Sequence, residues 1–170
     1  VILDSDALIH FLALCPYGVE KYSYYFNHFP VLSLNLGIME TTEKVVELIL
    51  LIRSENEINL KLLVNEVETL ASLFGLSVTP TDEYYGWSYD PDSQLRKSYK
   101  EAYKKAYDKE LKEVPTHGGL ETGYMSRIFP DMDIVTMGPN CIDIHTPQER
   151  LEIKTLYEVH DFLKNWLGEL

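Results

Sequence analysis

The sequence predicts a mixed α+β fold in two lobes, an antiparallel β-β-α-β lobe followed by a lobe in which helices and strands alternate. Three observations lead to this prediction. Apolar and polar residues alternate over 32–37, a second apolar run follows at 44–54, and a stripe with helical periodicity spans 59–75. A period of two is typical of a strand with one covered face, and a period of 3.6 is typical of an amphipathic helix.

The chain opens with a predicted short helix. Asp4, Ser5 and Asp6 are residue types that favour a helix N-cap, and the segment 7–15 is apolar at most positions before Pro16 closes it. The tyrosine-rich run 21–30 that follows is compatible with either a connector or a strand.

The next two segments are predicted to pair as an antiparallel hairpin. The first strand, over 31–40, places leucines on one face and small or polar residues on the other, namely Leu32, Leu34 and Leu36 against Ser33, Asn35 and Gly37. The second strand covers 44–54, and the turn-like residues 40–43 separate the two. Two strands joined by a loop of about four or five residues are typical of a hairpin.

A helix and a third strand complete the first predicted lobe. The helix covers 59–75 and ends at Gly75, a residue type that favours a helix C-cap. The third strand begins at Leu76 and leads into an exit loop that reaches Trp87.

The second lobe is predicted to begin after the acidic turn 89–94. A long helix over 93–111 carries Tyr99, Tyr103 and Tyr107 on one face, which we interpret as a packing stripe. The later elements are a short strand near Val114, a helix toward Phe129, a buried strand over 133–138 and a last helix over 154–167. Alternating helices and strands are typical of parallel α/β layers.

Composition excludes some classes of partner. The chain has 170 residues and a net charge of −12, from 27 acidic and 15 basic residues, which argues against nucleic acid and anionic membranes.

Cys15 and Cys141 show no paired spacing, as expected for free thiols in a reducing compartment. No apolar run reaches the about 18–20 residues of a membrane span. The start at Val1, without a Met, predicts a piece of a longer chain.

His145 is the first candidate for chemistry. It follows an apolar segment, sits in a tight turn before Pro147, and precedes Glu149 by four residues. A neutral imidazole is a standard zinc ligand, and a carboxylate at this spacing is suited to orient the ring or the backbone. The alternative is a solvated histidine in a loop.

Two further features suit an anionic ligand. Gly118 and Gly119 permit a close backbone approach just before a predicted helix, although a plain glycine turn has the same pattern. Arg53 and Asn35 lie on the two hairpin strands, and an arginine there is suited to clamp a carboxylate. The alternative for Arg53 is a strand-end side chain in solvent.

The order of these motifs along the whole chain resembles the aminoacyl-histidine dipeptidases (Xaa-His dipeptidase, peptidase D) of the two-zinc exopeptidase superfamily. The matching stretches are SLNLG, LIRS, YYGWSYDPDSQL, HGGLETG and PDMDIVTMGPNCIDIHTPQERLEI, of which the part from 116 to 153 is the most specific. The resemblance implies that residues 1–86 are the second half of a lid (dimerisation-type) lobe. Residues 87–170 are then the C-terminal part of an α/β catalytic lobe.

The resemblance also implies roles for single residues. His145 falls at the C-terminal zinc ligand and Glu149 beside it as a supporting residue, whereas the substrate-pocket positions are Asn35, Arg53, His117, Gly118, Gly119 and Glu121. In the full enzyme, two zinc ions (with cobalt or manganese as substitutes) share a water that an upstream Glu deprotonates to attack a dipeptide. This chain has no H-x-D motif and no Glu-Glu pair, so we expect it to be inactive alone.

Two other functions remain open at this stage. One is a tripeptide aminopeptidase or deacylase of the same superfamily. The other is a non-catalytic module that binds peptides or dimerises, because an unpaired edge of the lid-type sheet is suited to join a second copy. For the dipeptidase we expect a cytoplasmic location, a dipeptide substrate, and neither nucleic acid nor a membrane as partner.

Overall fold

The computed structural model describes residues 5–81 and 85–169. The chain divides into two compact units, which are described separately. The first unit comprises Val1–Tyr89 and Pro115–Pro130, and the second comprises Asp90–Val114 and Asp131–Leu170. The segment that contains Gly118 and Gly119 therefore packs with the first unit, although the chain has already entered the second unit before it.

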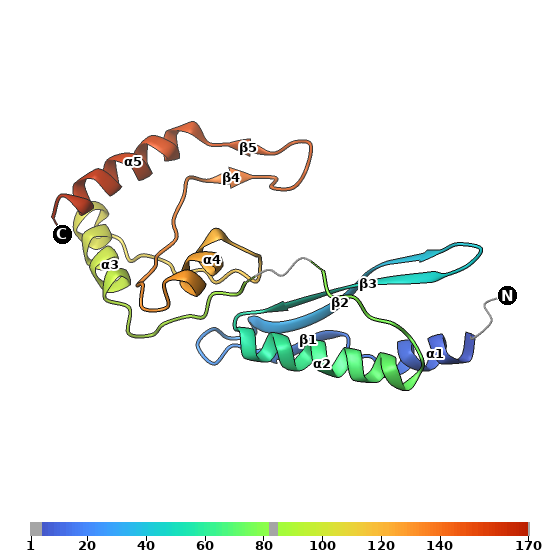
Figure 1. The fold of residues 1–170 in the computed structure, drawn as a ribbon. Helices are drawn as coiled ribbons and strands as arrows, with labels where there is room; N and C mark the ends of the chain where they lie inside the picture. Colours follow the sequence, from blue (N-terminus) through green and yellow to red (C-terminus); the bar gives the residue numbers. More distant parts are fainter. Residues whose placement is uncertain (1–4, 82–84, 170) are drawn as a thin grey trace. The chain divides into compact units, whose positions relative to one another are not determined.

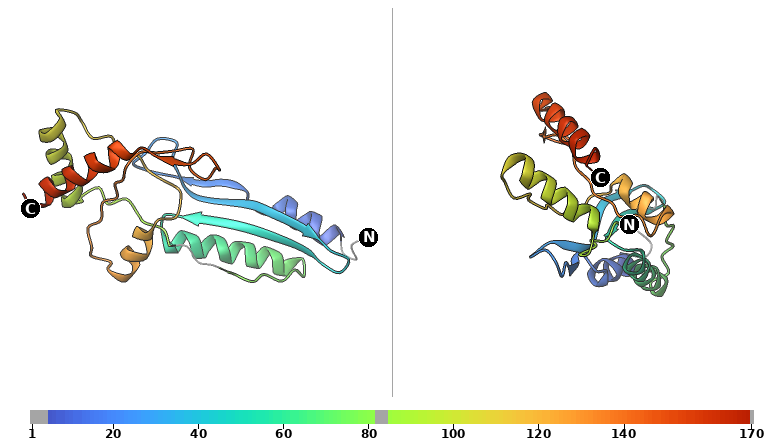
Figure 2. Two further views of the ribbon diagram at one scale, coloured as in Figure 1. Left: turned by 90° about the horizontal axis from the view of Figure 1, so that it is seen from above. Right: turned by 90° about the vertical axis from the view of Figure 1, so that its left-hand side faces the viewer.

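The first unit is a three-stranded antiparallel sheet with the helices of residues 5–14 and 57–73 on one face (Figure 1 and Figure 2). Its elements are α1 (Ser5–Leu14), β1 (Gly18–Tyr22), β2 (Pro30–Thr41), β3 (Val46–Ser54), α2 (Glu57–Leu73) and α4 (Glu121–Ile128). The strand order is β1-β2-β3, with β2 in the centre. The predicted hairpin is confirmed, and its loop closes with a hydrogen bond of 2.9 Å from the Thr42 nitrogen to the Val45 oxygen.

The core of the first unit lies between the sheet and the helices α1 and α2. Alternation along β2 buries Leu32 and Leu34, as predicted, while Asn35 on the opposite face is exposed. The buried cluster consists of Phe11, Cys15, Leu32, Leu34, Leu63, Val67 and Ala71. Burying these side chains removes apolar surface from water, which is the main favourable term in folding.

Helix α2 has the predicted stop signal. Gly75 adopts a φ of +67°, which an L side chain would adopt only with strain. Its nitrogen donates to the Ser72 oxygen (3.1 Å), and the Leu76 nitrogen donates to the Ala71 oxygen (2.9 Å). This pair of bonds is the Schellman arrangement, which satisfies the last carbonyl groups of a helix. At the other end, Asn56 accepts a hydrogen bond from the Asn59 nitrogen.

The predicted β-β-α-β order is wrong in its third strand. The segment 76–81 forms no strand, and residues 82–84 of the predicted exit loop lie outside the described part of the chain. The third strand is instead β1, which precedes the hairpin and pairs with β2 through Gly18 opposite Leu34. All five residues of β1 are exposed, so the strand carries no alternation that would have revealed it. The tyrosine-rich run after Tyr22 is mostly a connector.

The second unit contains a helix pair and a short strand pair. Its elements are α3 (Gln94–Tyr107), β4 (Cys141–Ile142), β5 (Arg150–Leu151) and α5 (Ile153–Leu167). The predicted tyrosine stripe is confirmed as packing, because Tyr99 is buried against Phe162 and Trp166, at ring-centroid distances of 5.2 and 5.1 Å. The Trp166 indole also donates a hydrogen bond of 3.0 Å to the Ser98 hydroxyl.

Two segments of the second lobe that were predicted to be strands are described by the structure but form no strand. Neither the segment near Val114 nor 133–138 pairs with a strand, and the pairing between β4 and β5 is antiparallel rather than parallel. Val135 and Met137 instead pack directly against the helix pair. Their apolar character therefore reflects burial under helices, which a short apolar run cannot distinguish from burial in a sheet.

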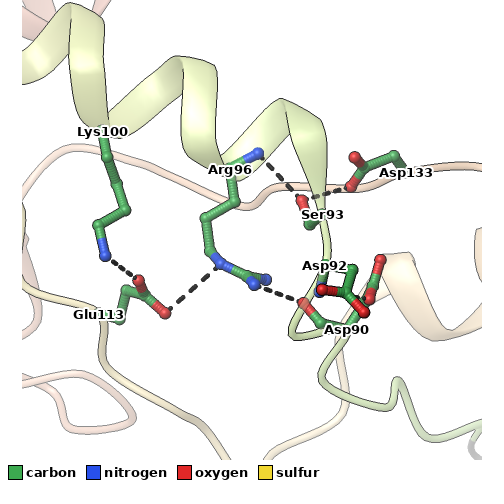
Figure 3. A network of polar contacts seen from close by, with 7 residues as sticks. All are labelled: Asp90, Asp92, Ser93, Arg96, Lys100, Glu113 and Asp133. Carbon is green, nitrogen blue, oxygen red and sulfur yellow. Dashed lines mark hydrogen bonds and ion pairs between the residues drawn. The ribbon is translucent and has the colours of Figure 1, made fainter.

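A polar network fixes the start of α3 (Figure 3). The buried Ser93 hydroxyl donates to Asp133 (2.6 Å) and accepts from the Arg96 nitrogen (3.0 Å). The second carboxylate oxygen of Asp133 accepts from the Leu95 nitrogen at 2.8 Å. Glu113 binds Lys100 on the same helix at 2.6 Å. The network joins α3 to Glu113 and Asp133, which lie before and after the segment 115–130 in the sequence.

The predicted fold class is confirmed as a mixed α+β chain with antiparallel sheets. Cys15 and Cys141 are both free thiols, as predicted. Among the described residues, no helix combines the length and apolar character needed to cross a membrane.

Candidate functional site

The hairpin has a polar face that points away from helices α1 and α2. Ser33 on β2 lies directly opposite Arg53 on β3, and Asn35 lies opposite Leu51, one same-face position further along. Side chains of directly opposed residues are near neighbours on one face of a sheet. The strand pairing therefore places a hydroxyl, a guanidinium and an amide on one surface of the first unit.

The segment that precedes α4 binds to this polar face through His117. The His117 Nε2 atom is hydrogen-bonded to the Ser33 Oγ atom at 2.7 Å. The Arg53 Nη1 atom donates to the His117 backbone oxygen at 3.4 Å. The ring of Phe29 meets the His117 ring edge to face, with 6.2 Å between centroids. Two opposed residues of the hairpin thus hold the side chain and the backbone of a single histidine.

The surroundings of His117 favour the neutral form of its imidazole. Burial lowers its pKa below the ordinary value, and the positive charge of Arg53 lowers that pKa further. Both causes act in the same direction because each disfavours the charged form of the ring. A neutral imidazole has one nitrogen that donates and one that accepts, so its bond to Ser33 engages one of only two polar atoms.

Arg53 differs from the other arginines in its partners. Arg96 pairs with Glu113, Arg127 with Glu57, and Arg150 with Asp143. Within residues 5–81 and 85–169, Arg53 pairs with no carboxylate, and its one hydrogen bond goes to a backbone oxygen. A guanidinium has five N–H donors in a fixed fork, so most of them remain for a ligand.

The two glycines after His117 form an exposed turn. The Gly118 nitrogen donates to the Thr116 hydroxyl at 3.2 Å, and both Gly118 and Gly119 are exposed. Helix α4 then begins at Glu121. Its N-cap residue is Leu120, whose side chain makes no capping bond to the first turn. Anions are favoured near a helix N-terminus because its backbone N–H groups point outward.

Close backbone contacts anchor α4 in the first unit. A side chain at Gly123 would collide with the Tyr85 carbonyl, and one at Gly86 would collide with the backbone at the end of β3. Arg127 on the same helix stacks over the Tyr85 ring, 4.0 Å from its centroid. The glycine turn is therefore flanked on one side by His117 and on the other by a helix packed against the same unit.

His145 lies in the second unit, in the loop that joins β4 and β5. It adopts a φ of +65°, which non-glycine residues seldom adopt. Its backbone nitrogen donates to the Glu149 carboxylate at 3.2 Å. Asp143, which also has a positive φ, accepts a hydrogen bond from Arg150 at 2.6 Å across the loop. The loop is thus tied at two places while the His145 side chain stays exposed.

Within the described residues, this arrangement offers one candidate metal ligand and no complete metal site. No described residue hydrogen-bonds to the His145 imidazole, so its nitrogens are available. However, the described residues contain no group of three His, Cys, Asp or Glu side chains that would hold a metal ion. A catalytic zinc needs about three protein ligands and a water. His145 could therefore act only as one ligand of a site that other residues complete.

The structure brings some of the predicted site residues into contact. Arg53 and His117 touch, with the Gly118-Gly119 turn directly after them, and Asn35 lies on the same face of the hairpin. Glu149 accepts a hydrogen bond from the backbone of His145. Sequence reasoning missed Ser33 as a site residue, although the alternation that placed Asn35 on the polar face placed Ser33 there too.

Comparison with known proteins now adds to this geometry. The profile of peptidase family M20/M25/M40 matches residues 14–169. Cytosol non-specific dipeptidase from Escherichia coli K12 is 29% identical over 167 residues, which cover 98% of this chain and 34% of that protein. The crystal structure of aminoacylhistidine dipeptidase from Vibrio alginolyticus matches with a TM-score of 0.87 at 29% identity, over 100% of this chain and 35% of that one.

The chain thus spans about a third of the length of these two relatives. Their similarity extends over nearly all of its residues and includes both the hairpin with the glycine turn and the loop that carries His145. The chain belongs to the peptidase family M20/M25/M40.

Proposed function

We propose that the full-length protein is a zinc-dependent dipeptidase that cleaves Xaa-His dipeptides. Peptidases of this family are typically metal-dependent, and both relatives are named as dipeptidases. The preference for a C-terminal histidine rests on the name of the Vibrio alginolyticus relative. Residues 1–86 are then the second half of a lid lobe and 87–170 the C-terminal part of the catalytic lobe.

Arg53 and the glycine turn carry this proposal. The hydrogen bond from Arg53 to the His117 oxygen places a guanidinium, which pairs with no described carboxylate, next to the exposed Gly118-Gly119 turn. A dipeptide ends in a carboxylate, for which a bidentate arginine and backbone donors are the matching partners. Asn35 on the same face is suited to bind the peptide amide, and Glu121 at the start of α4 borders the turn.

His145 supplies a metal ligand in this proposal. Its exposed imidazole projects from a loop that is held by Glu149 and by the ion pair between Arg150 and Asp143. Ligands that are oriented by neighbouring groups bind metals better than free ones. Two zinc ions, replaceable by cobalt or manganese, would activate water and polarise the peptide carbonyl. The remaining ligands and the general-base Glu belong to parts of the enzyme outside this chain.

The location and assembly follow from the same proposal. The Escherichia coli relative is named as a cytosol dipeptidase, which supports a cytoplasmic location here. The strand order leaves β3 at one edge of the sheet, where a second copy could pair in a homodimer. The net charge of −12 supports neither nucleic acid nor an anionic membrane as a partner.

The first test measures hydrolysis of Gly-His and β-Ala-His by the full-length protein, with and without EDTA. We expect chelator-sensitive activity that His145→Ala abolishes, while His160→Ala, a change at another exposed histidine, leaves it intact. If the protein cleaves only other peptides and EDTA inhibits that cleavage, the function is instead that of a tripeptide aminopeptidase or a deacylase. Absence of any cleavage would favour a non-catalytic binding module.

The second test concerns the carboxylate clamp. We expect Arg53→Ala to raise KM for dipeptides by about 10–100-fold, because a charge-assisted hydrogen bond contributes roughly 1.5–3 kcal/mol. Lys44→Ala removes an exposed cation from the loop of the same hairpin and controls for the change in net charge. An unchanged KM in Arg53→Ala would show that the substrate carboxylate binds elsewhere.

A further inference from the structure

The contact between Ser33 and His117 joins two distant parts of the sequence. The two residues are 84 positions apart, and their side chains approach to 2.7 Å. His117 is half-buried, and its backbone oxygen is held at the same time by Arg53. A hydrogen bond at the side chain and another accepted by the backbone oxygen restrict both the position and the rotation of this residue.

The Nε2 atom of His117 is not free to bind a ligand. That nitrogen is already bound to Ser33, and Phe29 packs against the ring. The next two residues are Gly118 and Gly119, which have the largest backbone freedom of any residue type. A flexible backbone binds a ligand with less loss of entropy when a neighbouring residue already holds it in place.

We propose that Ser33 and His117 are positioning residues, whose mutual hydrogen bond holds the Gly118-Gly119 backbone in the conformation that receives the substrate carboxylate. The role in substrate binding rests on the proposed dipeptidase function. The hold on the glycine turn is a property of the first unit and is measurable without any substrate. Because Ser33 is opposite Arg53, the same strand pair fixes the positions of both the Arg53 guanidinium and the backbone of the glycine turn.

The first experiment measures amide hydrogen exchange in the full-length protein by mass spectrometry. Ser33→Ala removes the hydroxyl, so peptides that cover 117–123, in which the Gly118 and Gly123 nitrogens are hydrogen-bonded, should exchange faster than in the wild type by about 3–10-fold, the range expected for one lost hydrogen bond. Ser33→Thr keeps the hydroxyl and should exchange like the wild type. Ser72→Ala, at an exposed serine on α2, is the matched control and should also be unchanged.

The second experiment measures kinetics on the same variants with Gly-His. Ser33→Ala should raise KM by about 3–10-fold with little change in kcat, because it weakens binding of substrate and transition state alike. Ser33→Thr should restore KM. In a His117→Phe background, which already lacks the hydrogen bond, Ser33→Ala should add nothing further.

The two experiments separate this inference from the proposed function. If Ser33→Ala leaves both the exchange at 117–123 and KM as in the wild type, the positioning role is overturned. The role is also overturned if Ser33→Thr behaves like Ser33→Ala, since the hydroxyl is then not what matters. If the wild-type protein cleaves no peptide, the dipeptidase proposal fails and the exchange measurement alone decides whether Ser33 holds the turn.

Discussion

At the scale of single residues, two histidines show how surroundings set the chemistry of one side chain. His117 is half-buried, bound to Ser33 and next to the positive charge of Arg53. His145 is exposed, adopts a strained backbone conformation and has no described partner for its imidazole. A positive φ in a non-glycine residue persists only where neighbouring contacts enforce it, here the bond from the His145 nitrogen to Glu149. The His117 ring is suited to fix the position of its own chain segment, and the exposed His145 ring is suited to bind a metal ion.

The lowered pKa of His117 predicts a pH dependence of stability. Its folded pKa lies below the about 6.5 of an unfolded chain, so the unfolded state takes up the proton first on acidification. This contribution to stability is complete above about pH 6.5 and is lost as the pH falls from there through the folded pKa. His117→Gln should remove it, since glutamine does not titrate.

Two measurements on the full-length protein check this prediction. Ring NMR titration, with the His117 signal assigned by its loss in His117→Gln, should give a pKa below about 6.5. Urea unfolding at about pH 7.5 and about pH 5.5 should show a larger loss of stability for the wild type than for His117→Gln. A His117 pKa at or above the unfolded value would contradict the electrostatic argument.

At the scale of elements, helices α2 and α3 begin and end where local hydrogen bonds satisfy their backbone. Helix α2 ends in the Schellman arrangement at Gly75, and α3 ends at Asp108 in a left-handed conformation. The start of α3 is different, because its N-cap residue Ser93 is buried and also binds Asp133 from a distant segment. Burial raises the pKa of Asp133, but bonds from Ser93 and the backbone outweigh this and lower it overall.

Removal of the α3 cap should destabilise the second unit. Ser93→Ala loses the bond to the Arg96 nitrogen and leaves Asp133 without its hydroxyl partner, with an expected cost of about 1–2 kcal/mol. The free energy of unfolding in urea measures this cost. Ser72→Ala at an exposed helical position should change it by less than about 0.5 kcal/mol. An equally small effect of Ser93→Ala would show that the cap contributes little.

At the scale of the whole molecule, the candidate residues are divided between the two compact units. The hairpin face and the glycine turn belong to the first, and the loop with His145 belongs to the second. The relatives are about three times as long as this chain, and the missing metal ligands are expected in the remainder. Under the proposed function, the chain would therefore contribute part of the substrate site and one metal ligand, and the two lie in different units.

This division predicts how zinc binds. The 170-residue chain alone should bind zinc weakly, because one imidazole cannot replace the about three protein ligands of a catalytic site. The full-length protein should bind zinc far more tightly, and His145→Ala should weaken that binding. Calorimetric titration of both proteins measures the difference. Equally tight, His145-dependent binding by the short chain would contradict the prediction that the other ligands lie outside it.

Short-range patterns in the sequence were sufficient for the elements whose cause is local. The alternation that buries Leu32 and Leu34 and exposes Asn35 predicted β2 with its polar face, and Gly75 predicted the end of α2. The helices α3, α4 and α5 also lie where their patterns placed them. Such features depend on residues within a few positions of each other, where side-chain periodicity and backbone freedom decide the conformation.

Only the tertiary structure decided the features that depend on distant partners. Strand β1 is exposed throughout and owes its conformation to pairing with β2, and the apolar run 133–138 packs under helices instead of joining a sheet. The bond between Ser33 and His117 arises because the chain returns to the first unit after α3. By itself the sequence determined which residues could bind a metal or a carboxylate. Which of these residues meet was decided when the segment 115–130 packed back onto the first unit, because no periodicity encodes a contact across 84 residues.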